Sequence, residues 1–122
     1  MSTAIVIDDN RQTADTLAQM LRVLGFDARP AYGPSPAITL LGHMIPDLVL
    51  LDINMPGIDG LEVLAYLRRE PRLMTVPVIV VTSDDQPETR QRACHVGAQG
   101  FLTKPVTLDI LEAELKRLGL TV

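Results

Sequence analysis

Five polar side chains stand at or just behind the ends of apolar runs in the sequence. Three are carboxylic acids, one is a hydroxyl and one is an amine: Asp8, Asp9, Asp52, Thr82 and Lys104. If the three acids meet in the fold, their mutual repulsion is costly unless positive charge compensates it. A hard divalent cation that prefers oxygen ligands, such as Mg²⁺, would supply two positive charges and the lysine a third. These residue types therefore predict a magnesium site.

The same set of side chains could carry out phosphoryl transfer. A carboxylate held beside Mg²⁺, an amine and a hydroxyl is arranged to attack a phosphoryl group and form an aspartyl phosphate. The metal and Lys104 would stabilise charge on the transferring oxygens, and Thr82 would donate a hydrogen bond to one of them. Each residue alone is weak evidence, because an acid after a strand is often only a helix cap. Together the five residues indicate a site.

The strands that position these side chains can be predicted from short apolar runs. Continuous runs rich in Val, Ile and Leu are typical of strands buried on both faces. Four such runs cover 4–7, 48–51, 78–81 and 101–102. A fifth candidate strand, 26–32, contains Pro30, which cannot donate to a strand ladder and therefore favours an edge position.

Helical patterns lie between the strands. Apolar residues recur at intervals of three and four, and the fourth segment is mainly polar. The segments are 14–24, 38–45, 61–67, 87–96 and 108–118. Gly25 and Gly119 mark helix ends, and Thr107 is the predicted N-cap of the last helix. This alternation predicts an α/β fold, a mostly parallel sheet with helices on both faces. The five polar side chains should converge at the carboxyl edge of that sheet, where ligands bind.

Composition narrows the class of protein. A chain of 122 residues is shorter than a typical domain of roughly 150, so one domain over 1–122 is expected. A net charge of -4 and four aromatic residues disfavour direct binding of nucleic acid. The single cysteine, Cys94, excludes an internal disulfide, favours a cytoplasmic location and is expected to be a packing residue. No apolar run could span a membrane, and His43 and His95 have no partner at metal-ligand spacing.

Four motifs together resemble the receiver domain of two-component response regulators, in the form of a single-domain chemotaxis regulator. The motifs are I-D-D-N at 7–10, L-D-I-N-M-P-G-I-D-G at 51–60, V-V-T-S at 80–83 and F-L-T-K-P at 101–105. The similarity extends over essentially the whole chain. It implies a flavodoxin-like doubly wound fold, with five parallel strands in the order 2-1-3-4-5.

The resemblance also implies a role for each site residue. Asp52 would be the phosphoacceptor and a metal ligand, Asp9 a direct ligand of Mg²⁺, and Asp8 a ligand largely through water. The backbone carbonyl of Asn54 would be a further ligand, and Lys104 would pair with the phosphoryl group. The turn after the acceptor would be shaped by Pro56, Gly57 and Gly60, and the Lys104–Pro105 peptide bond would be cis.

In this family the signal is carried by a threonine and an aromatic residue, here Thr82 and Phe101. The threonine would turn toward the phosphoryl group, and the aromatic ring would move into the space that it leaves. Its position at the start of a buried strand, taken without the resemblance, favours a core role for Phe101. The output face would comprise the fourth helix, the fifth strand and the fifth helix, roughly 87–118. It would bind a downstream protein target or output domain, or a second copy of the chain.

Two functional classes compete for these residues. A receiver accepts a phosphoryl group from a histidine kinase or phosphotransfer protein and is not an enzyme, although it assists its own phosphorylation and dephosphorylation. A phosphatase of the haloacid dehalogenase type also uses an aspartyl phosphate and Mg²⁺, but its nucleophile lies in the first motif, usually D-x-D. Here the acidic pair comes first, and Asp52-Ile53-Asn54 lacks the second acid. A receiver that serves only as a docking surface is a third possibility, which the complete residue set disfavours.

Two departures from the common receiver pattern follow Thr82. Ser83 is larger than the alanine or glycine most often found there, and we hypothesise that it narrows access to Asp52 and slows phosphoryl exchange. Asp84 and Asp85 add negative charge near the site. We expect both to cap the helix that begins near residue 87.

Overall fold

The computed structural model describes residues 2–55 and 58–121, and within these ranges five parallel strands form one sheet. Their order is β2-β1-β3-β6-β7. The strands are β1 (Thr3–Ile7), β2 (Asp27–Ala31), β3 (Leu48–Asp52), β6 (Val78–Thr82) and β7 (Gly100–Thr103). Counted along this sheet alone, the order is the expected 2-1-3-4-5, so the predicted strand arrangement is confirmed.

A short hairpin follows β3 and was not predicted. Its strands, β4 (Asn54–Met55) and β5 (Ile58–Asp59), pair antiparallel outside the main sheet. The hairpin occupies the segment in which the sequence indicates only a turn. Two residues expected to shape that turn, Pro56 and Gly57, lie outside the described residues.

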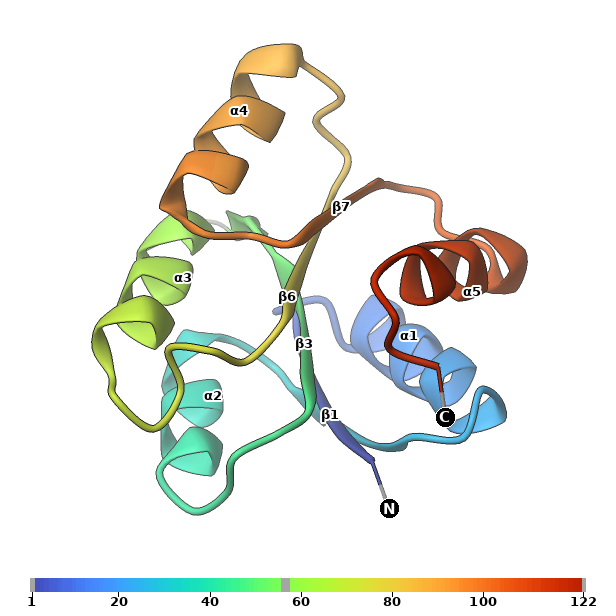
Figure 1. Ribbon diagram of the computed structural model, residues 1–122, viewed down its shortest axis with the longest axis horizontal. Coiled ribbons are helices and arrows are strands. Elements are labelled where there is room, and N and C mark those ends of the chain that lie inside the picture. Colours follow the sequence, from blue (N-terminus) through green and yellow to red (C-terminus); the bar gives the residue numbers. More distant parts are fainter. Residues whose placement is uncertain (1, 56–57, 122) are drawn as a thin grey trace.

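Helices cover both faces of the sheet, as predicted. They are α1 (Arg11–Val23), α2 (Pro34–Leu41), α3 (Gly60–Arg69), α4 (Pro87–Val96) and α5 (Leu108–Arg117). In Figure 1, α1 and α5 lie on one side of the sheet and α2, α3 and α4 on the other. Gly25 and Gly119, predicted to end helices, have φ angles of 101° and 72°, which glycine adopts without strain.

Two hydrophobic cores form because side chains alternate between the faces of each strand. One core, beneath α2, α3 and α4, includes Ile5, Ile7, Val49, Leu51, Val78 and Val80. The other, beneath α1 and α5, includes Ala4, Val6, Leu48, Leu50, Ile79 and Val81. Because both faces are covered, the central strands have continuous apolar sequences rather than alternating ones. At the edge, β2 tolerates Pro30, which lies opposite Val6 of its neighbour β1.

The second helix is shorter than its apolar pattern predicts. α2 ends at Leu41, and the Gly42 amide donates to the carbonyl groups of Ile38 and Thr39 as the chain turns. Ile45 therefore lies beyond the helix and is 53% exposed. Pro46 disfavours helical geometry at Ile45, so the helix could not continue to the end of the predicted segment.

Cys94 is exposed, so the expectation of a packing residue was wrong. Of the α4 residues, all of which are described, Ala93 alone is buried. The polar sequence of α4 correctly predicts this shallow packing, and Cys94 lies on the outward side. His95 of α4 is exposed as well, as is His43 in the turn after α2.

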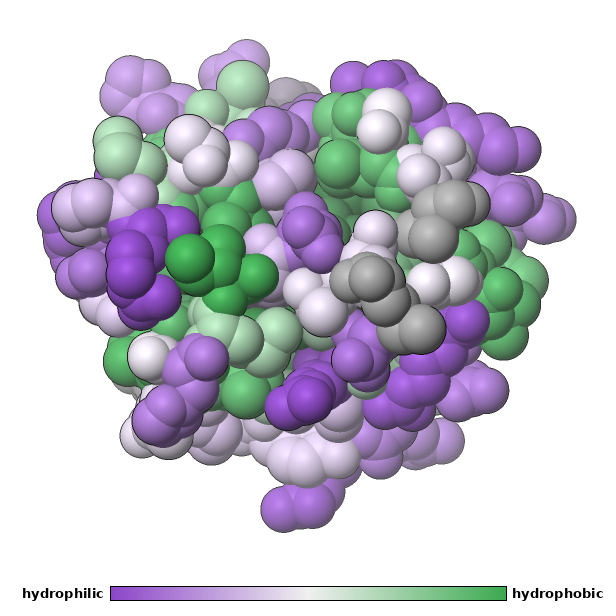
Figure 2. Space-filling view, turned by 60° about the horizontal axis from the view of Figure 1, so that its bottom comes forward, coloured by the Kyte–Doolittle hydropathy of each residue, from purple (hydrophilic) through white to green (hydrophobic). Residues whose placement is uncertain are grey.

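Figure 2 shows the edge of the sheet at which the strands begin, where polar and apolar residues are mixed. A hydrophobic area lies toward the side that carries α2 and α3. Ile45 and Met74, each about half exposed, belong to loops that lead into β3 and β6. Among the described residues, no helix has both the length and the apolar character needed to cross a membrane.

Candidate phosphorylation site

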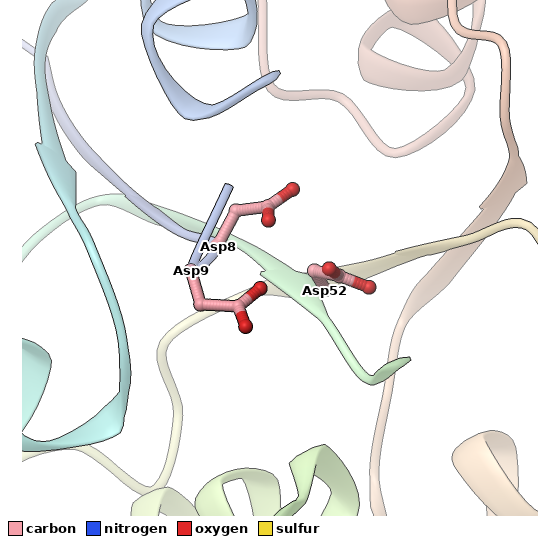
Figure 3. Close-up of side chains that lie close together, drawn as sticks. All are labelled: Asp8, Asp9 and Asp52. Carbon is pink, nitrogen blue, oxygen red and sulfur yellow. The ribbon is translucent and has the colours of Figure 1, made fainter. Parts of the chain in front are cut away.

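The parallel register of the central strands brings the predicted acids together. Ile7 lies opposite Leu51 in the β1–β3 pair, so Asp8 and Asp52 leave the sheet at the same level. One carboxylate oxygen from each of Asp8, Asp9 and Asp52 lies within 4.8 Å of the other two. Figure 3 shows the three side chains grouped where β1 and β3 end. The predicted convergence at the carboxyl edge is therefore what the structure shows.

Lys104 provides the positive charge expected beside these acids. Its Nζ lies 3.1 Å from Asp8 Oδ2 and 3.4 Å from Asp52 Oδ2. Both carboxylates are buried, with Asp8 0% and Asp52 5% exposed. Buried charges are tolerated when they are paired and hydrogen-bonded. The Lys104 amide donates to the Thr82 carbonyl at 2.7 Å, and the Lys104–Pro105 peptide bond is cis.

The two buried aspartates are oriented by the same local device. The amide of Asn10 donates to Asp8 Oδ1, and the amide of Asn54 donates to Asp52 Oδ1, each at 2.9 Å. In each case an aspartate accepts a hydrogen bond from the backbone two residues later, which is the geometry of an Asx turn. One oxygen of each acid is thus fixed by its own loop, and the other faces Lys104. Asp9 is exposed at the rim of the site.

The electrostatic environment of Asp52 favours an added cation. Burial raises the pKa of Asp52 above its ordinary value. The hydrogen bond from the Asn54 backbone amide lowers this pKa. The nearby Asp8 carboxylate raises it, and Lys104 lowers it. One lysine facing three carboxylates leaves an excess of negative charge. Oxygen ligands in this arrangement fit a hard divalent cation such as Mg²⁺.

The side chain of Asn54 has a role that the sequence interpretation missed, since only its carbonyl was considered. Its Nδ2 donates to Thr82 Oγ1 at 2.5 Å and lies 3.3 Å from Ser83 Oγ. The amide of Asp84 donates to the same Thr82 oxygen at 3.1 Å. The threonine hydroxyl therefore accepts two hydrogen bonds and keeps its own proton to donate. The signal for this contact was the asparagine two residues after Asp52, in the same motif.

The two acids after Ser83 behave differently from each other. Asp84 accepts from the Gln86 amide at 2.9 Å and from Thr89 Oγ1 at 2.6 Å, so it braces the first turn of α4. These hydrogen bonds, chiefly that from Thr89, lower the pKa of Asp84. Among the described residues, the side chain of Asp85 accepts a hydrogen bond only from Gln86 Nε2, at 3.3 Å. The N-cap position itself is Gln86, without a side-chain cap. Of the two acids expected to cap the helix, Asp84 alone has a hydrogen bond to a residue of α4.

Phe101 is half-buried and links three elements. Its ring packs against the core beneath α2, α3 and α4, and the Arg90 guanidinium lies 5.4 Å from the ring centroid. Its amide donates to the Glu114 carboxylate at 3.1 Å. Arg117 also binds Glu114 and is the main reason that the pKa of Glu114 is lowered. The residue is therefore partly core, as its position suggested, and also joins β7 to α4 and α5.

Gly60 allows α3 to begin directly against the backbone that follows Asp52. A Cβ atom at this position would lie 2.4 Å from Ile53 Cα and 2.9 Å from the Asp52 carbonyl oxygen. Such a contact would force the helix away from the end of β3. Asp59 caps the helix, accepting from the Leu61 amide at 3.0 Å.

The family of the chain follows from comparison with known proteins. The family model described as the response regulator receiver domain matches residues 4–116. The chain belongs to this family.

Solved structures agree with that assignment. The chain is similar to chemotaxis protein CheY4 of Vibrio cholerae, with 26% identity over 96% of this chain and 98% of that chain and a TM-score of 0.89. It is also similar to the receiver domain of a DNA-binding response regulator from Colwellia psychrerythraea 34H, with 30% identity over 98% of each chain and a TM-score of 0.88. A response regulator from Burkholderia pseudomallei, with a phosphorylated aspartic acid, a calcium ion and citrate, is 28% identical over 94% of this chain and 66% of that chain, with a TM-score of 0.85.

Proposed function

We propose that residues 1–122 form a single receiver domain that acts as a phosphorylation-activated signalling switch, with Asp52 as the phosphoacceptor. The observation that carries the proposal is the position of Asp52. It is buried at the carboxyl edge of the sheet, beside Asp8 and Asp9 and 3.4 Å from Lys104 Nζ. The phosphorylated aspartic acid of the Burkholderia pseudomallei response regulator supports the same chemistry here.

The phosphoryl group would come from a phosphohistidine of a histidine kinase or phosphotransfer protein. A carboxylate oxygen of Asp52 forms a bond to phosphorus while the bond between phosphorus and the imidazole nitrogen breaks. The leaving nitrogen keeps the electron pair and takes a proton from solvent. Loss of the signal is hydrolysis, in which water attacks phosphorus, inorganic phosphate departs and the Asp52 carboxylate is restored. In this sense the domain assists both of its own reactions without being an enzyme for a separate substrate.

Mg²⁺ is the proposed cofactor, because the site offers oxygen ligands of the kind that it prefers. Asp8, Asp9, Asp52 and the backbone carbonyl of Asn54 would hold it. When bound, it would neutralise charge on the phosphoryl oxygens. Lys104 would exchange its pairing with the carboxylates for one with the phosphoryl group.

Thr82 and Phe101 would transmit the change. Thr82 keeps a proton to donate, so on phosphorylation its hydroxyl would leave Asn54 and bind a phosphoryl oxygen. Phe101 would then move inward, away from Arg90. Phosphorylation would shift an existing equilibrium between inactive and active conformations. A partner that prefers the active form is needed to make that shift large.

The output face would be formed by α4, β7 and α5. It would contact a downstream protein target or output domain, or a second copy of the chain in a homodimer. We do not propose that this chain itself binds nucleic acid or a membrane. An exposed free thiol, Cys94, fits a reducing compartment and supports a cytoplasmic location.

The test of this function is phosphoryl uptake from a small donor such as acetyl phosphate, followed by mass spectrometry of the intact protein. The parent chain should gain one phosphoryl group when Mg²⁺ is present, and Asp52→Ala should gain none. Asp109→Asn, which removes an exposed acid of α5, serves as the control and should behave as the parent does. Uptake that persists in Asp52→Ala, or rapid turnover of many donor molecules per chain, would contradict the proposal. The second result would revive a phosphatase of the haloacid dehalogenase type, which membership of the receiver family otherwise leaves without support.

A further inference from the structure

A groove lies between α3 and α4, and none of Asp8, Asp9, Asp52, Thr82 and Lys104 lines it. Its volume is about 650 Å³, and its floor includes the half-buried side chains of Ala65 and Val96. The two helices lie next to each other on the same side of the sheet (Figure 1). The rim carries three acids, which are Asp59 at the N-cap of α3, Glu62 in the first turn of α3 and Glu88 in the first turn of α4. Two basic residues of α4, Arg92 and His95, also line the groove.

A basic side chain of the protein itself already lies across this groove. Arg92 of α4 reaches across to Asp59, with Nη2 3.4 Å from Oδ2, and both side chains are at least half exposed. Within residues 2–55 and 58–121, neither Glu62 nor Glu88 has an ion-pair partner. A position in the first turn of a helix favours an acid through the helix dipole. The helix dipole explains the position of each acid separately. It does not explain why acids from two different helices border the same groove.

We propose that this groove docks an amphipathic helix of a protein partner that carries lysine or arginine beside its apolar stripe. The apolar stripe would cover Ala65 and Val96, and the basic side chains would lie beside Glu62 and Glu88, as Arg92 lies beside Asp59. Helices bind grooves in other proteins by this combination of apolar anchors and flanking charge. The inference goes beyond the proposed switch, because one side of the groove is formed by α3, which is not part of the proposed output face.

The probe for this surface is a synthetic helical peptide of leucine and lysine, with binding measured by calorimetry at low salt. In Glu62→Gln/Glu88→Gln, binding should weaken about fivefold to tenfold, as expected for the loss of two exposed ion pairs. The matched control is Asp109→Asn/Glu112→Gln, which removes the same charge from α5, including one acid in its first turn. The control should stay within about twofold of the parent, because screening weakens attraction over longer distances. Thermal unfolding of both variants shows that they remain folded.

Three further measurements locate the contact. The amide resonances of Ala65 and Val96 should shift on titration with the peptide, a leucine–glutamine peptide should bind at least fivefold more weakly, and Asp52→Ala should bind as the parent does. Equal weakening in the groove variant and the control would show general attraction to an acidic protein and overturn the proposal. Resonance shifts confined to other elements, equal binding of the glutamine peptide, or loss of binding in Asp52→Ala would overturn it too.

Discussion

Asn54 shows how two parts of one residue serve the site. Its backbone amide fixes one oxygen of Asp52, and its side-chain amide holds the hydroxyl of Thr82. Asn54 therefore positions both the proposed phosphoacceptor, Asp52, and the Thr82 hydroxyl that would bind the phosphoryl group. Ser83 stands beside this arrangement, with its hydroxyl 3.3 Å from the Asn54 amide, so its size bears on access to Asp52.

Replacing Ser83 with alanine should raise the rates of both phosphoryl uptake and phosphoryl loss. The smaller side chain opens the approach to Asp52, and a change of about 1 kcal/mol in the barrier corresponds to about a fivefold change in rate. Uptake can be followed with acetyl phosphate, and loss after removal of the donor. Ser35→Ala, at an exposed serine of α2, is the control. Unchanged rates in Ser83→Ala would show that the serine does not restrict access.

At the scale of elements, α4 is anchored mainly at its ends. Asp84 braces its first turn, while Arg68 of α3 holds the chain just after its last turn. The Arg68 guanidinium donates to the Gly97 carbonyl at 2.8 Å, to the Val76 carbonyl at 2.9 Å and to Gln99 Oε1 at 2.8 Å. Burial lowers the pKa of Arg68, as expected for a cation that gives up water for carbonyl oxygens. One side chain thus joins α3, the loop before β6 and the segment between α4 and β7.

Arg68→Ala should destabilise the protein by about 2–3 kcal/mol, because several acceptors lose a charged hydrogen-bond donor. The neighbouring Arg69 is exposed, and Arg69→Ala should change stability by no more than about 0.5 kcal/mol. Urea unfolding followed by circular dichroism measures both. Similar losses in the two variants would mean that the Arg68 contacts contribute little.

For the whole molecule, the net charge of -4 is unevenly distributed. Three acids gather at one edge of the sheet, and among the described residues Lys104 alone forms ion pairs there, with Asp8 and Asp52. Folding therefore concentrates negative charge at a place where a bound cation would reduce the repulsion between the carboxylates. A ligand that binds only the folded state stabilises that state in proportion to the logarithm of its concentration.

Mg²⁺ should accordingly raise the thermal unfolding midpoint, and a chelator should reverse the effect. At a concentration about a hundredfold above the dissociation constant, the gain is about 2.7 kcal/mol. Asp9→Asn should reduce this response, whereas Asp109→Asn should keep it. A full response in Asp9→Asn, measured by calorimetry with and without Mg²⁺, would exclude Asp9 as a ligand.

Local patterns in the sequence predicted most of the fold because they act over a few residues. Continuous apolar runs and capping residues identified the strands of the main sheet and four of the helices closely. The spacing of apolar residues predicted too long a second helix, because Gly42 and Pro46 keep α2 from reaching Ile45. The same spacing gave no sign of the hairpin after β3. Both errors concern backbone turns, for which apolar spacing carries little information.

The chemical groups of the site could be predicted from the sequence alone, since their types and their places after apolar runs are local properties. How those groups contact one another depends on the way the whole chain folds. The parallel register sets Asp8 beside Asp52, and the packing of loops from three strands brings Lys104 to both acids and the Asn54 amide to Thr82. Such contacts join residues far apart in the chain, and their distances depend on the packing of the whole sheet.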